Sequence, residues 1–356
     1  MEHYKIKFAV IGQGHIGKRH AEMIRRNTNC ELVAVCDSAP KEKLGIENLT
    51  EKFYSNIDDL LKSHPEIEVL NICTPNGLHA EHALKALHAG KNVVVEKPMA
   101  LSKSDCEKII YTALDQHKTV FCVMQNRYSP PSVWLKDIIE KKTIGDIYMV
   151  QLNCYWNRDE RYYKAGNWKG TQHLDGGTLF TQFSHWVDII YWLFGDITNI
   201  QAKFADFSHK NNTDFEDSGF VSFDFINGGM GSINYSTSVW DKNLESSLTI
   251  VGSKGSIKVG GQYMDKVEVC NIENYKMPVL KETNPANDYG AYKGSANNHH
   301  SVIENVVNTL TGKNKIGTNA LEGLKVVDII ERIYALRPAN VLKNNSTELK
   351  STTQKI

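Results

Sequence analysis

A glycine-rich turn near the start of the sequence is the first feature that suggests chemistry. Gly12, Gly14 and Gly17 have the spacing G-x-G-x-x-G, directly after an apolar run and at the start of a helical pattern over 15–26. The tight turn needs a residue without Cβ at Gly12, Gly14 lets the backbone approach a pyrophosphate, and Gly17 lets helix and strand pack closely. The helix N-terminus then offers free N–H groups to phosphates. A glycine-rich turn without a ligand is the alternative, but the strand before and the helix after it favour dinucleotide binding.

Asp37 bears on which dinucleotide is bound. It ends the second apolar run, twenty residues after Gly17. A carboxylate at this place accepts hydrogen bonds from both hydroxyls of the adenine ribose and repels a 2′-phosphate. No Arg follows at once, and the nearest cations are Lys41 and Lys43. The sequence therefore predicts NAD rather than NADP, although an Asp that merely ends a strand would look the same.

Glu96, Lys97 and Pro98 directly follow the apolar run 93–95. The carboxyl ends of parallel strands are where such sheets bind ligands. A lysine beside a nicotinamide ring can take the proton of a substrate hydroxyl as hydride leaves, and partial burial would lower its pKa. A proline after it can hold a cis bond that aims the side chain. The ordinary alternative is a solvated surface lysine.

The elements that must position these residues divide the chain into two parts. The first 125 residues alternate short β-branched runs with helical patterns, which predicts a parallel sheet with helices on both faces. Later segments predict a strand over 146–156, one apolar helix over 176–194, a largely open antiparallel sheet over 197–269 and two closing helices. We expect an α/β protein with three parts: an NAD-binding Rossmann domain (1–125), an α+β domain for substrate and oligomer contacts (126–336) and a polar tail (337–356).

Composition excludes several functions. The length of 356 residues suggests roughly two domains. Forty-one Lys plus Arg balance forty-one Asp plus Glu, which argues against a protein held by nucleic-acid phosphates. No apolar run approaches the ~20 residues of a membrane helix. Seven scattered cysteines and the lack of a signal-peptide pattern predict reduced thiols in the cytoplasm. His299-His300 has no Cys or acidic cluster beside it in the sequence, so we expect no metal.

Several motifs together resemble those of the Gfo/Idh/MocA oxidoreductases, from residue 5 to about 336. They are Gly12–Gly17, Cys73-Thr74-Pro75-Asn76 with His79, Glu96-Lys97-Pro98, and Gly176-Gly177…His185…Asp188. The resemblance implies Lys97 and His185 as the acid/base pair, and an open sheet that often forms the contacts of a homo-oligomer, a dimer or tetramer. One residue departs from the family pattern. Many members carry Asp where this chain has Thr181, and Thr can only hydrogen-bond. We interpret Asp175 and Asp188 as structural.

A narrower resemblance, to the UDP-N-acetylglucosaminuronate 3-dehydrogenases, rests on residues 153–171, 125–128 and 243–255. Such a substrate carries a diphosphate and a carboxylate, which guanidinium and ammonium groups recognise. Five aromatic residues between 155 and 168 offer flat faces for uracil or sugar. A solvated loop with surface aromatics is the alternative. The resemblance also allows 2-oxoglutarate as a second substrate that reoxidises bound NADH.

We expect Lys97 and His185 to be the catalytic pair, with a definite set of cofactor and substrate contacts around them. The expected cofactor contacts are Gly12, Gly14, His15, Ile16, Gly17, Asp37, Thr74, Pro75, Asn76, His79, Glu96, Lys97, Gln125, Arg127 and Trp168. The expected substrate contacts are Lys97, Arg127, Tyr155, Asn157, Arg158, Tyr163, Lys169, Thr181 and His185, and Arg161 and Lys164 add further cations.

The expected function is NAD-dependent oxidation of the C3 hydroxyl of UDP-N-acetylglucosaminuronate to a 3-keto sugar, for surface polysaccharides. One alternative is the same chemistry on a free sugar, inositol or another polyol. Another is an NAD-binding sensor without catalysis, because a fold does not fix a function. A sensor need not keep Lys97 and His185 together beside the nicotinamide.

Overall fold

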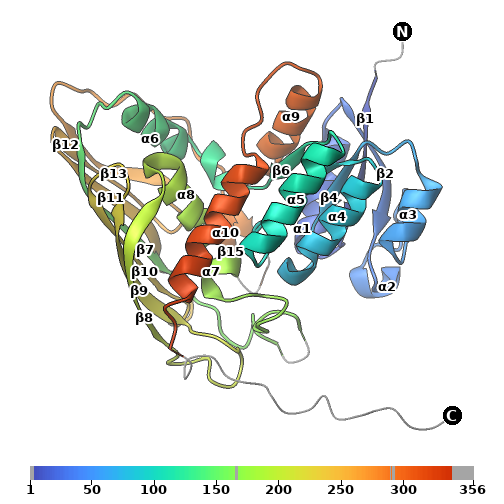
Figure 1. The fold of residues 1–356 in the computed structure, drawn as a ribbon, viewed down its shortest axis with the longest axis horizontal. Helices are drawn as coiled ribbons and strands as arrows, with labels where there is room; N and C mark the ends of the chain where they lie inside the picture. The colour runs from blue at the N-terminus through green and yellow to red at the C-terminus, as the bar shows by residue number, and fades with distance from the viewer. Residues whose placement is uncertain (1–3, 165–166, 289, 291–292, 339–356) are drawn as a thin grey trace.

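The computed structural model describes residues 4–164, 167–288, 290 and 293–338 (Figure 1). Apart from residues 337 and 338, the expected polar tail lies outside the described residues. Over the part of the chain that is described, no helix is long and apolar enough to cross a membrane. All seven cysteines are free thiols.

The first half is a six-stranded parallel sheet in the order β3-β2-β1-β4-β5-β6, as expected for a Rossmann domain. Its strands read as continuous apolar runs because helices cover both faces. Strand order reverses between β1 and β4, so the crevice at their carboxyl ends is a ready ligand site. The strands are β1 (Ile6–Ile11), β2 (Cys30–Cys36), β3 (Lys52–Tyr54), β4 (Val69–Ile72), β5 (Asn92–Val95) and β6 (Val120–Cys122).

Local features at their N-termini explain where the helices of this half begin. α1 begins directly after Gly14, as the glycine spacing predicts, and α5 begins where the Ser102 Oγ accepts the backbone N–H of Asp105 at 3.0 Å. A short 3-10 turn, Asn76–Leu78, precedes α4. The helices are α1 (His15–Arg26), α2 (Lys41–Leu44), α3 (Ile57–Ser63), α4 (His79–His88) and α5 (Lys103–Asp115).

The second half contains a seven-stranded sheet in the order β13-β12-β11-β7-β10-β9-β8. Only the pair β7/β10 is parallel among these neighbours, so the expectation of a mostly antiparallel sheet is confirmed. Its strands are β7 (Ile147–Tyr155), β8 (Ile197–Ala205), β9 (Ser218–Phe225), β10 (Met230–Ser236), β11 (Glu245–Gly252), β12 (Gly255–Gly260) and β13 (Lys266–Ile272); β14 (Ala286–Asp288) pairs separately with β15 (Lys293–Ala296).

The prediction of one apolar helix over 176–194 is wrong. The chain forms α7 (Thr178–Thr181) and α8 (Ser184–Phe194), separated by Gln182 and Phe183. In a continuous helix the Thr181 carbonyl would accept the backbone N–H of His185. Here it accepts a hydrogen bond from the Lys97 ammonium instead, at 2.7 Å. The break between α7 and α8 therefore makes the Thr181 carbonyl available to Lys97.

The closing helices join the two halves. α9 (His299–Leu310) packs on α1, and α10 (Ala320–Tyr334) packs on both α5 and α8. Figure 1 shows α10 running between the Rossmann half and the second sheet, with α6 (Pro130–Glu140) and α8 on the same side of that sheet. One continuous cluster of buried side chains extends from the parallel sheet through α10 into the second sheet. The two halves thus share a core beside the cleft between them.

Candidate active site

A cavity of about 830 Å³ lies between the two halves, at the carboxyl ends of the parallel strands. This volume is in the range of small-molecule and cofactor sites. Its walls combine the glycine-rich turn, the ends of β2, β4 and β5, the start of α8 and the loop after β7. The sequence-predicted residues that line it are Gly12, Gly14, His15, Ile16, Asp37, Thr74, Pro75, Asn76, His79, Glu96, Lys97, Gln125, Arg158, Trp168, Lys169, Thr181 and His185.

The three glycines of the turn occupy three different environments. Gly12 has a φ of +89°, and a Cβ there would lie 2.6 Å from the carbonyl oxygen of Cys73. A Cβ on Gly17 would overlap the Gly12 carbonyl, so Gly17 packs the helix on the strand instead of facing the cavity. A Cβ on Gly14 would meet nothing within 4 Å. The turn therefore leaves open space at the N-terminus of α1, which fits a dinucleotide phosphate.

The Asp37 carboxylate is held beside this turn. Its Oδ2 accepts the backbone N–H of Gln13 at 2.6 Å, and its Oδ1 accepts that of Ala39 at 2.8 Å. Because both oxygens are fixed by backbone donors, the carboxylate faces the cavity in one orientation. This arrangement suits an NAD ribose and repels a phosphate on it.

Lys97 lies two residues after the end of β5, and its peptide bond to Pro98 is cis. Its Nζ donates to the Thr181 carbonyl at 2.7 Å, which aims the ammonium across the cleft. Burial lowers the pKa of Lys97 and the nearby Arg158 adds to the effect, while Glu96 and Asp175 oppose it. A lysine with a lowered pKa is a better base at neutral pH.

His185 approaches the same cavity from the second half. It is 2% exposed, and neither ring nitrogen makes a hydrogen bond with any other described residue. Burial and the positive charge of Lys97 hold the pKa of His185 well below its usual value. The imidazole is therefore neutral at pH 7, with one nitrogen able to donate to a ligand and the other able to accept.

Thr181, where many family members carry Asp, is connected to a carboxylate by a hydrogen bond. Its hydroxyl makes a short hydrogen bond with Asp175 Oδ1. Asn76 Nδ2 donates to the Thr181 hydroxyl at 2.7 Å and to the Asp175 carbonyl at 2.8 Å. Burial raises the pKa of Asp175 to about 6. Asp175 thus lies behind the cavity wall, where its hydrogen bonds connect Asn76 of the Rossmann half with Thr181 of the second half.

The loop after β7 brings aromatic and cationic side chains to the cavity. Arg158 is 2% exposed, stacks on the Trp156 ring and donates to Gln182 at 2.8 Å and to the Lys293 carbonyl at 3.0 Å. The Lys169 Nζ lies 3.9 Å from the centre of the Tyr162 ring, and burial with repulsion from Arg158 lowers its pKa to about 8. The members that line the cavity are Trp156, Arg158, Arg161, Tyr162, Lys164, Trp168 and Lys169.

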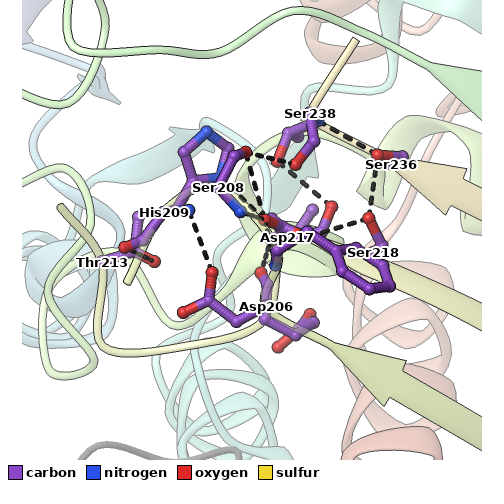
Figure 2. Close-up of polar contacts among 12 residues, drawn as sticks. Asp206, Ser208, His209, Thr213, Asp217, Ser218, Ser236 and Ser238 are labelled. Carbon is purple, nitrogen blue, oxygen red and sulfur yellow. Dashed lines mark hydrogen bonds and ion pairs between the residues drawn. The ribbon is translucent and has the colours of Figure 1, made fainter. Parts of the chain in front are cut away.

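A network of serine and acidic side chains fixes a segment that contacts this loop, and Figure 2 shows the network. Asp217 accepts the backbone N–H groups of Phe207 and Ser208 at 2.8 and 2.7 Å. The segment that it fixes contacts the cavity loop, since the Asp214 N–H donates to the Gly170 carbonyl at 2.8 Å. Ser208 Oγ contacts Asp217 directly at 3.3 Å, so no histidine stands between them as a serine-hydrolase relay requires. The network is a structural support.

The structure does not bring Arg127 into the cavity. Its guanidinium is buried, with Nη2 2.6 Å from Asp188 and Nη1 2.5 Å from Glu322. These two carboxylates neutralise the guanidinium charge that we expected to bind cofactor or substrate. The interpretation of Asp188 as structural agrees with this pair.

Three other expected substrate contacts also lie away from the cavity. Tyr155 is the last residue of β7, directly before the cavity-lining Trp156, and successive side chains of extended backbone face opposite sides. Tyr163 packs with Tyr162 and Phe215 in a small buried cluster. Asn157 Nδ2 donates to the Val239 carbonyl at 2.7 Å. Aromatic density alone could not say which rings turn inward.

Sequence reasoning also missed several cavity residues. Gln182 lies at the break between α7 and α8 and binds Tyr162 through its amide at 2.8 Å. Ser295 accepts from Gln125 at 3.1 Å, 170 positions apart. No local motif marks these positions; the failed helix periodicity around Gln182 is the nearest to a signal. The missed residues with polar side chains include Ser38, Asn56, Asp58, His82, Lys85, Gln182, Asn287 and Ser295.

One group of side chains has a spacing that a metal ion could use. The ligand atoms of His20, Glu96 and His299 lie within 4.8 Å of one another, and all three residues are buried. Two of them are hydrogen-bonded directly, because His20 Nε2 lies 2.8 Å from Glu96 Oε1. That bond accounts for their approach. The group lies directly beside Lys97, whose backbone N–H donates to Glu96 Oε2.

Comparison with known proteins agrees with this architecture. Residues 6–124 match the oxidoreductase family with an NAD-binding Rossmann fold, and residues 133–258 match the GFO/IDH/MocA C-terminal domain. The WlbA dehydrogenase of Bordetella pertussis, solved with NADH and UDP-GlcNAcA, is 31% identical with a TM-score of 0.81, over 93% of this chain and 96% of that one. The WlbA dehydrogenase of Chromobacterium violaceum, in the same kind of complex, is 31% identical with a TM-score of 0.81 over 94% of each chain.

A more distant curated relative acts on a different substrate. The levoglucosan dehydrogenase of Pseudarthrobacter phenanthrenivorans is 26% identical over 74% of this chain and 76% of its own. The levoglucosan dehydrogenase and the two WlbA dehydrogenases thus share a dehydrogenase activity and differ in the sugar named with them. With an NAD-binding domain, a matching C-terminal domain and relatives solved with NADH, the chain belongs to the Gfo/Idh/MocA family of NAD-dependent oxidoreductases.

Proposed function

We propose that this enzyme oxidises the C3 hydroxyl of UDP-N-acetylglucosaminuronate to a ketone, in the formation of nucleotide sugars for surface polysaccharides. One observation carries the proposal. Lys97 and His185, from separate halves of the molecule, reach one cavity whose walls also hold the cationic, aromatic loop after β7. The two WlbA dehydrogenases support the choice of substrate, because each was solved with UDP-GlcNAcA and NADH.

The residues divide the reaction between them. NAD, when bound along Gly14 and Asp37, supplies the acceptor for the hydride of the substrate carbon. Lys97, aimed by the Thr181 carbonyl, takes the hydroxyl proton, and its lowered pKa makes the neutral amine easier to form. His185, neutral and without a protein partner among the described residues, hydrogen-bonds the same oxygen and can exchange that proton. Positioning two groups on one oxygen provides much of the rate.

The anions of the substrate find their partners in the loop. Lys164 and Lys169 line the cavity and can face the diphosphate or the carboxylate. The two arginines of the loop already donate to protein groups: Arg158 to Gln182 and the Lys293 carbonyl while it stacks on Trp156, and Arg161 to the Asp159 carboxylate and the Asp241 carbonyl. They hold the loop in shape, and Arg158 adds its buried charge. The rings of Tyr162 and Trp168 offer faces for uracil or sugar.

The proposal extends to partners. A 2-oxo acid such as 2-oxoglutarate would accept the hydride from bound NADH and leave as the 2-hydroxy acid. The exposed Met149, Phe220 and Met230 on neighbouring strands of the open sheet favour a homo-oligomer. Light scattering measures that state. The free thiols fit a reducing compartment, so we place the enzyme in the cytoplasm.

Turnover is the decisive test. Purified enzyme is mixed with NAD and UDP-N-acetylglucosaminuronate, with and without 2-oxoglutarate, while absorbance follows NADH and mass spectrometry follows the keto sugar. We expect a ketone product, and a loss of 10²–10⁴-fold in kcat for Lys97→Met. Lys103→Met, on the exposed start of α5, is the matched control. Absence of both NADH and ketone would remove the proposal, and an unchanged rate in Lys97→Met would remove the role of Lys97.

The relationship to levoglucosan dehydrogenase supports a second candidate, the same oxidation of a free sugar or polyol. Calorimetric binding of UDP alone separates the two, because a polyol enzyme has no site for uracil and diphosphate. Binding of UDP that competes with the nucleotide sugar favours the first candidate. Turnover of inositol or a free sugar without any UDP affinity favours the second.

A further inference from the structure

Directly behind Lys97, the carboxylate of Glu96 lies between two buried imidazoles. Glu96 Oε1 is 2.8 Å from His20 Nε2 and 3.4 Å from His299 Nε2. Its Oε2 accepts the backbone N–H of Lys97 at 3.2 Å. His20 and His299 are each 1% exposed and do not line the cavity. Three elements therefore converge here: α1 of the cofactor turn, the end of β5, and α9.

The hydrogen bonds of His20 fix which nitrogen carries its proton. The Asn71 amide donates from Nδ2 to His20 Nδ1 at 2.8 Å, so Nδ1 is the acceptor. The proton of a neutral ring is then on Nε2, which points at Glu96. His299 Nε2 lies within ion-pair distance of Glu96, but neither ring nitrogen of His299 makes a hydrogen bond with any described residue. The carboxylate thus accepts the N–H of one imidazole, His20, and lies beside a second imidazole at 3.4 Å.

The charge of Glu96 reaches both groups of the acid/base pair. Although burial opposes ionisation, the two histidines hold the pKa of Glu96 well below its usual value. The resulting negative charge favours the protonated forms of Lys97 and His185 against their burial. The other titratable groups that sense Glu96 are Cys73 and His79, while Arg19 faces His299.

We propose that His20 and His299 are positioning residues: they hold Glu96 as a carboxylate behind Lys97, and this fixed charge sets the pH range in which Lys97 accepts the substrate proton. The inference rests on the proposed role of Lys97 as the base. It assigns a task to two buried histidines that touch neither the cavity nor, by themselves, the reacting atoms. It also explains why Glu96 is tied to α1 and α9 and not left facing solvent.

The test compares His299→Leu with Glu96→Gln through the pH profile of kcat/KM. Without the charge of Glu96, the neutral amine of Lys97 is favoured, so the acid limb of the profile moves to lower pH. We expect a shift of about 0.5–1 pH unit in each variant. The double variant should shift no further than Glu96→Gln, because the histidine acts only through the carboxylate. His299→Gln, which keeps an N–H donor, should remain close to wild type, and His300→Leu at the exposed neighbour is the control.

Two measurements separate this inference from other causes. Thermal unfolding with bound NADH checks that each variant is folded. If His299→Leu does not fold, the pH profiles of Glu96→Gln and His299→Gln still test whether the charge of Glu96 acts on Lys97. Nitrogen NMR of ¹⁵N-lysine-labelled enzyme, assigned with Lys97→Met, follows the Lys97 titration without turnover. It therefore decides the inference even if the proposed substrate is wrong.

The outcomes are distinct. An acid limb and a Lys97 titration that move together in Glu96→Gln and His299→Leu, without further movement in the double variant, support the proposal. An unmoved titration overturns it, as does a histidine effect that persists in the Glu96→Gln background. One tightly bound metal ion per chain, detected by elemental analysis and lost in His299→Leu, also overturns it, since the three residues would then be ligands.

Discussion

Replacing Asp175 by Asn should change how stability depends on pH. Asp175 is fully buried, and burial raises its pKa from 3.8 to about 6. A carboxyl with a raised folded-state pKa contributes stability below pH 3.8, and that contribution is lost as pH rises through 6. A shift of this size corresponds to roughly 3 kcal/mol in all, of which about 2 kcal/mol falls between pH 4 and 7. The free energy of unfolding of Asp175→Asn relative to wild type should therefore rise by about 2 kcal/mol over this range.

Urea unfolding followed by circular dichroism, repeated at each half unit of pH, measures this difference. The absolute offset depends on the hydrogen bonds from Gly170 and Thr181, which an amide keeps only in part, so the slope with pH is the observable. Asp115→Asn, on the exposed end of α5, provides the baseline. A difference that stays constant from pH 4 to 7 would refute the reasoning, because it would mean that the carboxyl ionises as it does in water.

Three further expectations follow from the site and its surroundings. Gly14→Ala should fold normally but bind NADH more than tenfold more weakly by fluorescence, whereas Gly17→Ala should lose stability as well, because its Cβ overlaps a backbone oxygen. Arg127→Leu should lower the free energy of unfolding by about 3–5 kcal/mol, because it leaves buried Asp188 unpaired. The double variant Arg127→Leu/Asp188→Leu should recover stability. An unchanged KM in the folded fraction would show that Arg127 pairs with Asp188 and does not bind substrate. Calorimetric affinity for UDP should fall as pH rises through about 8 in wild type, with the pKa of Lys169, and should lose that step in Lys169→Met; an unchanged step would assign it elsewhere.

The cofactor half could be predicted closely because its signals are local. The turn, the helix after it and the carboxylate at the end of β2 depend on contiguous residues and on strand order. α1 spans the residues that the glycine spacing and the helical pattern indicated. The same holds for Lys97, since a strand end identifies a ligand edge without knowledge of the partner half.

The contacts of the substrate half could not be predicted, because the residues that make them lie far apart in the sequence. The sequence predicted that the Arg127 guanidinium binds a ligand. It pairs instead with Asp188 and Glu322, which lie 61 and 195 positions away. The Asp175 carboxylate reaches Thr181 only because the chain turns between them. Charge and aromatic content could indicate an anion-binding loop, but not which side chains were already engaged by the protein.

The failed helix prediction shows where function overrides local preference. Apolar residues continue through 176–194, so periodicity alone favours a single helix. An unbroken helix would use the Thr181 carbonyl internally and leave the Lys97 ammonium without that acceptor. The break after Thr181 supplies the acceptor and brings Gln182 toward Arg158. A helix that is interrupted without Gly or Pro, although its apolar pattern continues, therefore indicates that another part of the protein uses its backbone groups. Here Lys97 of the Rossmann half uses the Thr181 carbonyl.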